Sequence, residues 1–219
     1  MFNNCNAFEN GEYDFFSKIK NNIKIIFDVG SKNNSIFLDF ENEVHYFEPM
    51  EKSLNELKQK NSNNSGSFFN NYGLGNNEST LTYYLNYESF VNRNRNRNRF
   101  ASETIDLQIK KAEKYIVERN ISAIDFLKID TEGFELEVIK GFGEFIKNVK
   151  IIQFEYGGTY QDKNIKLLDV INYLKKYSFN NFYYLDSRKI VKINNYNDHY
   201  QYCNIVTFND NFDNLYSNI

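Results

Sequence analysis

Carboxylates close four short apolar segments of this sequence, and this recurrence is its clearest chemical feature. Asp28, Glu48, Asp130 and Glu155 each end a run of β-branched or aromatic residues. Such runs, alternating with stretches of helical spacing, predict a mostly parallel sheet. The carboxyl ends of parallel strands meet at one edge, where α/β sheets bind their ligands. We therefore expect the four carboxylates to lie around one site.

The first two strand ends have the spacing of a nucleoside site. Gly30 follows Asp28 and Val29, and a glycine there allows a tight turn and a close approach of ligand to backbone. Glu48 stands about 20 residues further on, where a carboxylate meets ribose hydroxyls in nucleotide-binding sheets. An ordinary strand-end turn is the alternative interpretation of Asp28–Gly30 alone. The combined spacing favours the nucleoside site.

The third strand end carries Lys128, Asp130 and Glu132. In a buried strand, Lys128 and Asp130 point to one face and Leu127 to the other. A buried lysine needs a partner, and Asp130 is the nearest candidate. One interpretation is a catalytic group whose carboxylate is tuned by Lys128. The alternative is a structural ion pair at the start of a helix, with Glu132 close to the helix dipole.

Glu155 ends a further strand and is followed by the flexible pair Gly157 and Gly158. We take Glu155 as a candidate substrate contact, the alternative being a solvated acid in a surface turn. Two or three of these acids would suit Mg²⁺, which prefers oxygen ligands, but no metal site is predicted. The 2 histidines and 2 cysteines exclude a His-rich metal site and a disulfide framework. His45 is interpreted as structural.

The elements that position these residues are expected to alternate along the chain. Hydrophobic periodicity predicts helices over 51–60, 102–119, 135–142 and 165–177. It predicts strands over 24–29, 43–48, 67–72, 80–85, 125–130, 149–155, 182–185 and 202–208, with 188–193 as a hairpin partner or lead-in to the last.

Length and composition indicate one α/β domain over residues 1–219, with a lead-in over 1–22 and a low-complexity loop over 91–100. Aromatic residues make up 17% of the chain, enough to build a core from few bulky side chains. The net charge of -3 argues against a nucleic-acid partner. The four arginines of the loop, at 93, 95, 97 and 99, suggest either an anion contact or a solvated repeat.

The chain shows no signal peptide and no apolar run of about 20 residues, so we expect a cytoplasmic protein without a membrane partner. Abundant asparagine and lysine, with a single proline, indicate an A/T-rich genome, as in some parasites and large DNA viruses. A viral origin would place the protein in the host cytoplasm. The sequence indicates no particular oligomeric state.

With these segments lined up, the chain resembles the FkbM family of S-adenosylmethionine-dependent methyltransferases over residues 23–156. The run from Lys128 to Gly141 is the most specific part of the resemblance. The other matching motifs are Ile26–Gly30 (IFDVG), Tyr46–Pro49 (YFEP), Gly73–Gly75 (GLG), Thr104–Leu107 (TIDL) and Ile152–Glu155 (IQFE).

The resemblance implies a Rossmann-like class I methyltransferase fold, with a mostly parallel seven-stranded sheet, its last strand antiparallel, and helices on both faces. It implies S-adenosyl-L-methionine as cofactor and O-methylation of a sugar or small-molecule hydroxyl, in a glycan or secondary metabolite. Transferred to this chain, the family pattern assigns residues to two groups. The cofactor group is Asp28, Gly30, Ser31, Asn34, Glu48, Pro49, Gly73 and Leu74. The catalytic group is Lys128, Asp130 and Glu132.

One departure from the family pattern lies in the first loop, which reads Ser31-Lys32-Asn33-Asn34. Asn34 stands where the family has a second glycine, and asparagine tolerates positive φ better than most residues. This change motivates a second hypothesis, a degenerate methyltransferase fold that binds a partner without catalysis. A third, a nucleoside-cofactor oxidoreductase, is disfavoured because the loop lacks the GxGxxG pattern.

Overall fold

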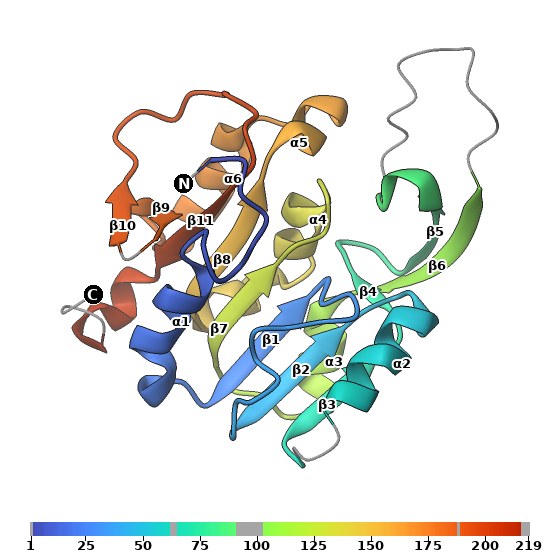
Figure 1. Ribbon diagram of the computed structural model, residues 1–219. Helices are drawn as coiled ribbons and strands as arrows, with labels where there is room; N and C mark the ends of the chain where they lie inside the picture. Colours follow the sequence, from blue (N-terminus) through green and yellow to red (C-terminus); the bar gives the residue numbers. More distant parts are fainter. Residues whose placement is uncertain (1, 62–64, 91–102, 188, 216–219) are drawn as a thin grey trace.

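The computed structural model describes residues 2–61, 65–90, 103–187 and 189–215, which form a large sheet between two layers of helices and a small second sheet (Figure 1). The large sheet has eight strands in the order β10-β9-β11-β8-β7-β1-β2-β3. Its members are β1 (Ile25–Val29), β2 (Glu43–Phe47), β3 (Ser67–Asn70), β7 (Ile124–Ile129), β8 (Val149–Tyr156), β9 (Phe182–Asp186), β10 (Lys189–Lys192) and β11 (Cys203–Phe208).

Strand direction confirms the expected mixed, mostly parallel sheet. β1 pairs in parallel with both β2 and β7, and β8 continues in parallel beside β7. β11 runs antiparallel to β8 and β9. The expectation of seven strands is corrected to eight, because β10 folds back on β9 as an antiparallel hairpin and extends the edge.

Helices cover both faces of the sheet, as expected. α1 (Glu12–Ile19) packs Phe15, Phe16 and Ile19 into the core on one face, where α2 (Glu51–Lys60) adds Leu57. The helices α3 (Ala112–Glu118), α4 (Glu135–Lys140) and α6 (Leu167–Lys175) fill the other core, beside the short α5 (Gly158–Asp162). Alternate residues of each central strand therefore face two separate apolar cores. The expected lead-in over 1–22 thus contains a core helix.

The helix expected over 102–119 is a strand followed by a shorter helix, and that prediction is wrong. Residues Thr104–Lys110 form β6, which pairs antiparallel with β5 (Ser79–Tyr84) and in parallel with β4 (Gly73–Leu74). Leu107 and Ile109 are buried while their neighbours are exposed, which is the two-residue period of a half-buried strand. The arginine tract of 93–99 lies outside the described residues.

The small sheet of β4, β5 and β6 lies beside the carboxyl ends of β1 and β2 (Figure 1). In the part of the chain that the structure describes, no helix combines the length and apolar character needed to cross a bilayer.

Candidate active site

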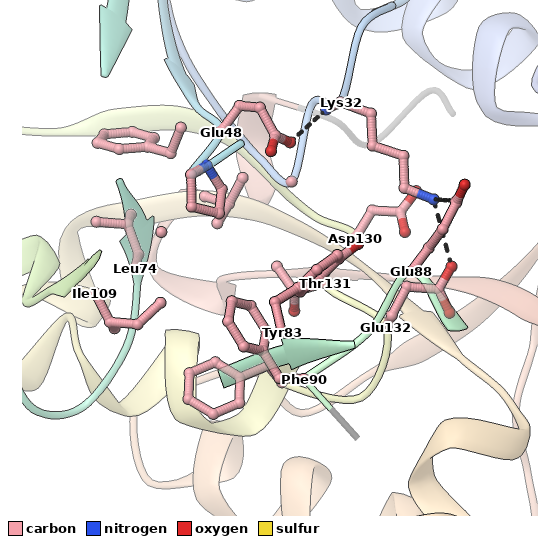
Figure 2. A pocket seen from close by; sticks show the side chains of 16 residues that line it. Lys32, Glu48, Leu74, Tyr83, Glu88, Phe90, Ile109, Asp130, Thr131 and Glu132 are labelled. Carbon is pink, nitrogen blue, oxygen red and sulfur yellow. Dashed lines mark hydrogen bonds and ion pairs between the residues drawn. The ribbon is translucent and has the colours of Figure 1, made fainter. Parts of the chain in front are cut away.

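A cavity opens at the carboxyl ends of β1, β2 and β7, where the sequence places the site. One wall carries Phe47, Leu74, Ile109 and Phe134, and is apolar. The opposite side carries the charged side chains of Lys32, Glu48, Glu88, Asp130 and Glu132 (Figure 2). The cavity therefore offers an apolar slot for a flat ring and polar groups along its edge.

Glu48 lies at the end of β2 with 4% of its surface exposed. One carboxylate oxygen accepts a hydrogen bond from the backbone N–H of Lys32 at 2.8 Å, and the other accepts one from the N–H of Met50 at 2.8 Å. Burial raises the pKa of Glu48 to about 7. A carboxylate fixed by two backbone donors, beside an open cavity, suits the hydroxyl pair of a ribose.

Gly30 is required by the close approach of two loops. Its φ is 83°, and a Cβ atom there would collide with the carbonyl oxygen of Asp130. The N–H of Gly30 donates to the carbonyl of Phe47, which ties the β1 loop to the end of β2. The glycine thus allows the loops after β1 and β7 to meet at the cavity floor.

The loop after Gly30 differs from the expectation. The residue with positive φ is Lys32, at 50°, and Asn34 is not among the residues with this conformation. The tolerance of asparagine for positive φ is therefore not needed at Asn34, because the left-handed residue of this loop is Lys32, two positions earlier. Asn34 is exposed, Ser31 is buried, and neither lines the cavity.

Lys32 bridges the cavity mouth. Its ammonium group lies 3.1 Å from a carboxylate oxygen of Glu88 and 3.6 Å from one of Glu132 (Figure 2). Glu88 follows β5, so these contacts join the first loop of the large sheet to the small sheet. Lys32 carried no signal in the sequence, because a lysine after a glycine loop is commonplace.

Asp130, Glu132 and Glu155 come together at the ends of β7 and β8, with one carboxylate oxygen from each lying within 4.8 Å of the others. Glu132 has a φ of 54° and is followed by Gly133 at 94°, so the loop turns sharply here. Non-glycine residues in this region are held there by their surroundings, and they concentrate at functional sites. Glu155 is buried, and burial followed by the charge of Asp130 raises its pKa well above the ordinary value.

Lys128 belongs to a polar layer beneath the cavity. Its Nζ lies 3.3 Å from Asp130 and 3.9 Å from Glu12 of α1. Burial alone would lower the pKa of Lys128, but the charges of Asp130 and Glu12 raise it. The same lysine keeps the pKa of Asp130 below its ordinary value against the effect of burial. Lys128 and Asp130 are thus a charged pair, as expected.

Glu12 also holds the next two strands. It accepts hydrogen bonds from Gln153 of β8 at 2.8 Å and from Asn204 of β11 at 3.0 Å. Asp28 faces the same layer, receives a 2.6 Å hydrogen bond from Ser35, and does not line the cavity. Burial raises the pKa of Asp28 to about 6.

Glu135 is a buried acid that sequence reasoning missed. One of its oxygens accepts from the N–H and the hydroxyl of Thr131, at 2.9 and 3.1 Å, and from the N–H of Gly133 at 3.2 Å. Burial raises its pKa to about 7. Glu135 therefore holds the loop on which Glu132 stands. The sequence feature that could have identified Glu135 is its position two residues after Gly133.

The structure thus divides the expected site residues by position. Those that line the cavity are Gly30, Glu48, Pro49, Gly73, Leu74, Asp130 and Glu132. Those that lie outside its lining are Asp28, Ser31, Asn34, Lys128 and Glu155. Three further lining residues were not predicted: Tyr83 of β5, Phe90 in the segment after β5, and Ile109 of β6. Ile109 was missed because β6 was expected to be part of a helix.

Comparison with known proteins places this site in a family. The model of the methyltransferase FkbM domain matches residues 28–180, more than half of the chain. The chain belongs to the FkbM family. Its family membership makes it an S-adenosylmethionine-dependent methyltransferase. Among curated protein sequences, none matches this chain.

Solved structures support the fold of this FkbM-family chain. An rRNA methylase from Streptococcus thermophilus superposes with a TM-score of 0.51 at 11% identity, covering 90% of this chain and 93% of its own. The N-methyltransferase NodS from Bradyrhizobium japonicum gives a TM-score of 0.51 at 8% identity, with coverage of 94% and 98%. A TehB-like SAM-dependent methyltransferase from Corynebacterium glutamicum gives 0.50 at 9%, with coverage of 91% and 87%. At these identities the likeness concerns the fold alone.

The residues of the FkbM-family site fit its cofactor. Glu48, Leu74 and Ile109 line the same cavity, where Glu48 would hold the ribose hydroxyls and the apolar side chains of Leu74 and Ile109 would flank the adenine ring. Because Gly30 has no side chain, the backbone there lies close to the Asp130 loop and leaves space for a ligand. S-adenosylmethionine, when bound, supplies a methyl group on a sulfonium centre.

Proposed function

We propose that this FkbM-family chain methylates a hydroxyl group of a sugar or another small polyhydroxylated molecule. The observation that carries the proposal is the position of Asp130 and Glu132, which lie on the cavity edge opposite the apolar slot and remain partly exposed, with side-chain exposures of 29% and 24%. An acceptor entering there meets carboxylates that accept hydrogen bonds from hydroxyl groups.

A hydroxyl is a weak nucleophile while it keeps its proton, so a positioned base accelerates transfer by about 10²- to 10⁴-fold. Asp130 stays ionised beside Lys128, which also holds its carboxylate in place at 3.3 Å. Asp130 and Glu132 are the carboxylates placed to receive the acceptor proton. Lys128 is buried and acts through Asp130.

Charge favours a neutral or cationic acceptor over one rich in phosphate. The chain carries a net charge of -3, and among the described residues the cavity lining carries Glu48, Glu88, Asp130 and Glu132 with Lys32 as its basic side chain. A phosphate chain near these carboxylates would be repelled. This supports a small-molecule or glycan acceptor and argues against a nucleic acid.

Titration calorimetry with S-adenosylhomocysteine tests the cofactor site first. We expect micromolar binding by the native protein and a loss of about 100-fold or more in Glu48→Ala, because charge-assisted hydrogen bonds contribute about 1.5–3 kcal/mol each. Glu51→Ala, an exposed acid on α2, is the matched control and should bind normally. Absence of binding to the folded native protein would favour the non-catalytic binding module, and binding of NADH instead would favour the oxidoreductase.

Methyl transfer then tests the acceptor. Free glycans and matched amines should be screened with labelled cofactor, with nucleotide sugars as the phosphate-bearing comparison, and the site of methylation assigned by mass spectrometry. We expect hydroxyl acceptors to be methylated, and Asp130→Asn to lower turnover about 100-fold or more with unchanged S-adenosylhomocysteine binding. Normal turnover in Asp130→Asn would remove its role as base, and exclusive methylation of amines would overturn O-methylation.

A further inference from the structure

The carboxylates of Asp130, Glu132 and Glu155 form a compact acidic trio between β7 and β8. One oxygen from each lies within 4.8 Å of the others. Hard divalent cations bind oxygen at about 2.1 to 2.6 Å, so oxygens sharing one ion lie up to about 4 to 5 Å apart. The trio therefore has the spacing of a cation site before any movement.

Glu155 supplies a second and separate observation. Its side chain is buried, with 6% of the residue exposed, and its Oε2 atom has no hydrogen-bond partner among the described residues. An unsatisfied buried polar atom costs about 1–3 kcal/mol, and more when the group is charged. Such an atom, beside two further carboxylates, is a position where a ligand that carries positive charge would be stabilised.

The two lysines that contact the trio do not reach all of it. Lys128 is shared between Asp130 and Glu12, and Lys32 between Glu132 and Glu88. Within the described part of the chain, neither lysine forms an ion pair with Glu155. Each contact uses part of a carboxylate that offers about four lone-pair positions, so the lysine contacts leave room for a cation.

We propose that Asp130, Glu132 and Glu155 bind one hard divalent cation, whose remaining positions are filled by water and by hydroxyl groups of the acceptor. The part concerning the acceptor rests on the proposed function, whereas binding of the ion does not. Asp130 and Glu132 are partly exposed and give the ion access from the cavity side. A bound cation lowers the pKa of a coordinated hydroxyl, so a weaker base suffices for methyl transfer.

Mn²⁺ is the probe, because its free aqua ion gives an electron paramagnetic resonance signal that weakens on binding. We expect one Mn²⁺ per native chain with a dissociation constant below about 1 mM, and competition by Mg²⁺ or Ca²⁺. Glu155→Gln and Glu132→Gln should each weaken binding at least tenfold. Glu137→Gln is the matched control, since Glu137 pairs with Lys140 on α4 and has a side-chain exposure of 30%, close to that of Glu132.

Two results would overturn the site. One is the absence of Mn²⁺ binding at millimolar concentration and pH 8, which would leave Asp130 and Glu155 as a pair that shares a proton. The other is binding that survives both glutamine variants, which would place the ion elsewhere. Glu132→Gln, in a partly exposed position, keeps the test valid if the buried Glu155→Gln variant fails to fold.

The cofactor titration separates this proposal from the proposed function. Protein treated with EDTA should bind S-adenosylhomocysteine as the untreated protein does, because Glu48 is not part of the trio. Cofactor binding without Mn²⁺ binding overturns the cation site alone. Mn²⁺ binding without cofactor binding overturns the methyltransferase proposal and leaves the cation site standing.

Discussion

The two halves of the active-site edge are built in different ways. The cofactor half, around Gly30, Glu48 and Leu74, consists of backbone turns, apolar walls and one carboxylate fixed by two N–H groups. The transfer half, around Asp130 and Glu155, consists of charged groups supported by a buried polar layer. The first half depends on local turns, and the second depends on residues brought together from the whole chain.

This difference separates the affinity for the cofactor from the placement of the carboxylates at the transfer half. A cofactor common to many enzymes needs a shape and a few donors, and the turns at the ends of β1 and β2, with the walls of the small sheet, supply these. The transfer half must hold several like charges side by side, which is stable only with compensating partners. Glu12 and Lys128 supply that compensation from α1 and β7, beneath the cavity. Mutations should therefore affect the two halves independently.

Removal of Glu12 should give the largest effect. Glu12→Ala leaves Lys128, Gln153 and Asn204 without a shared partner, and breaking a buried ion pair costs about 3–5 kcal/mol. Urea unfolding measures this loss, with Glu9→Ala, an exposed acid, expected to stay within about 0.5 kcal/mol of the native protein. S-adenosylhomocysteine affinity of the folded fraction should be unchanged. A tenfold loss of affinity would show that the two halves are coupled.

The acidity of Glu48 should make cofactor binding depend on pH. Its pKa is raised to about 7 by burial, and ribose hydroxyls donate to the ionised form. Affinity for S-adenosylhomocysteine should therefore fall as the pH drops through 7, by up to about tenfold per pH unit. Calorimetry at pH 6, 7 and 8 measures this, and Glu48→Gln should abolish the dependence. A flat profile in the native protein would contradict the assignment.

The same raised pKa has the opposite sign for the stability of the unliganded protein. Between the ordinary value of 4.5 and about 7, the folded state binds more protons at Glu48 than the unfolded state does. Stability from this group is therefore complete below about pH 4.5 and is lost as the pH rises through 7. Glu135, with a pKa also raised to about 7, contributes in the same direction.

The strained turn at Lys32 should have a smaller effect. Both Lys32→Gly and Lys32→Ala lose the contacts with Glu88 and Glu132, but only glycine relieves the φ of 50°. The glycine variant should be more stable than the alanine variant by about 1 kcal/mol. Thermal unfolding of the pair measures the difference, and a more stable alanine variant would contradict the left-handed turn.

Asn34→Gly should have the smallest effect. This change restores the second glycine of the family pattern, yet Asn34 does not have positive φ and does not line the cavity. We expect less than a twofold change in S-adenosylhomocysteine affinity and a stability loss of about 0.5 kcal/mol from the freer unfolded chain. A large gain in affinity would show that this loop limits cofactor binding.

Sequence patterns predicted the central strands and the cofactor half because their signals are local. Asp28-Val29-Gly30 and Glu48-Pro49 stand at strand ends, and helix α2 was expected with the bounds that the structure gives it. These patterns did not predict that Asp28, near the end of β1, is buried and points into the polar layer and not into the cavity. A strand end fixes the position of a residue along the strand, and its face depends on the strand register.

The polar layer and the small sheet were not predicted from the sequence, for two different reasons. Glu12 lies in a segment without any motif, and its partners Gln153 and Asn204 are 141 and 192 residues away. By contrast, β6 carried a legible signal in the alternation of Leu107 and Ile109 with polar residues. The polar, charged stretch that follows β6 along the chain favoured one continuous helix over a strand followed by a helix.

The long reach of Glu12 has a consequence for biosynthesis. Helix α1 is synthesised before every strand of the large sheet, but two of the hydrogen bonds that its glutamate accepts come from β8 and β11, and β11 is the last of these strands in chain order. During translation the apolar face of α1 stays exposed until these strands are made, and contacts this distant in sequence form slowly. We therefore expect the nascent chain to be vulnerable to aggregation and proteolysis until β11 has emerged from the ribosome.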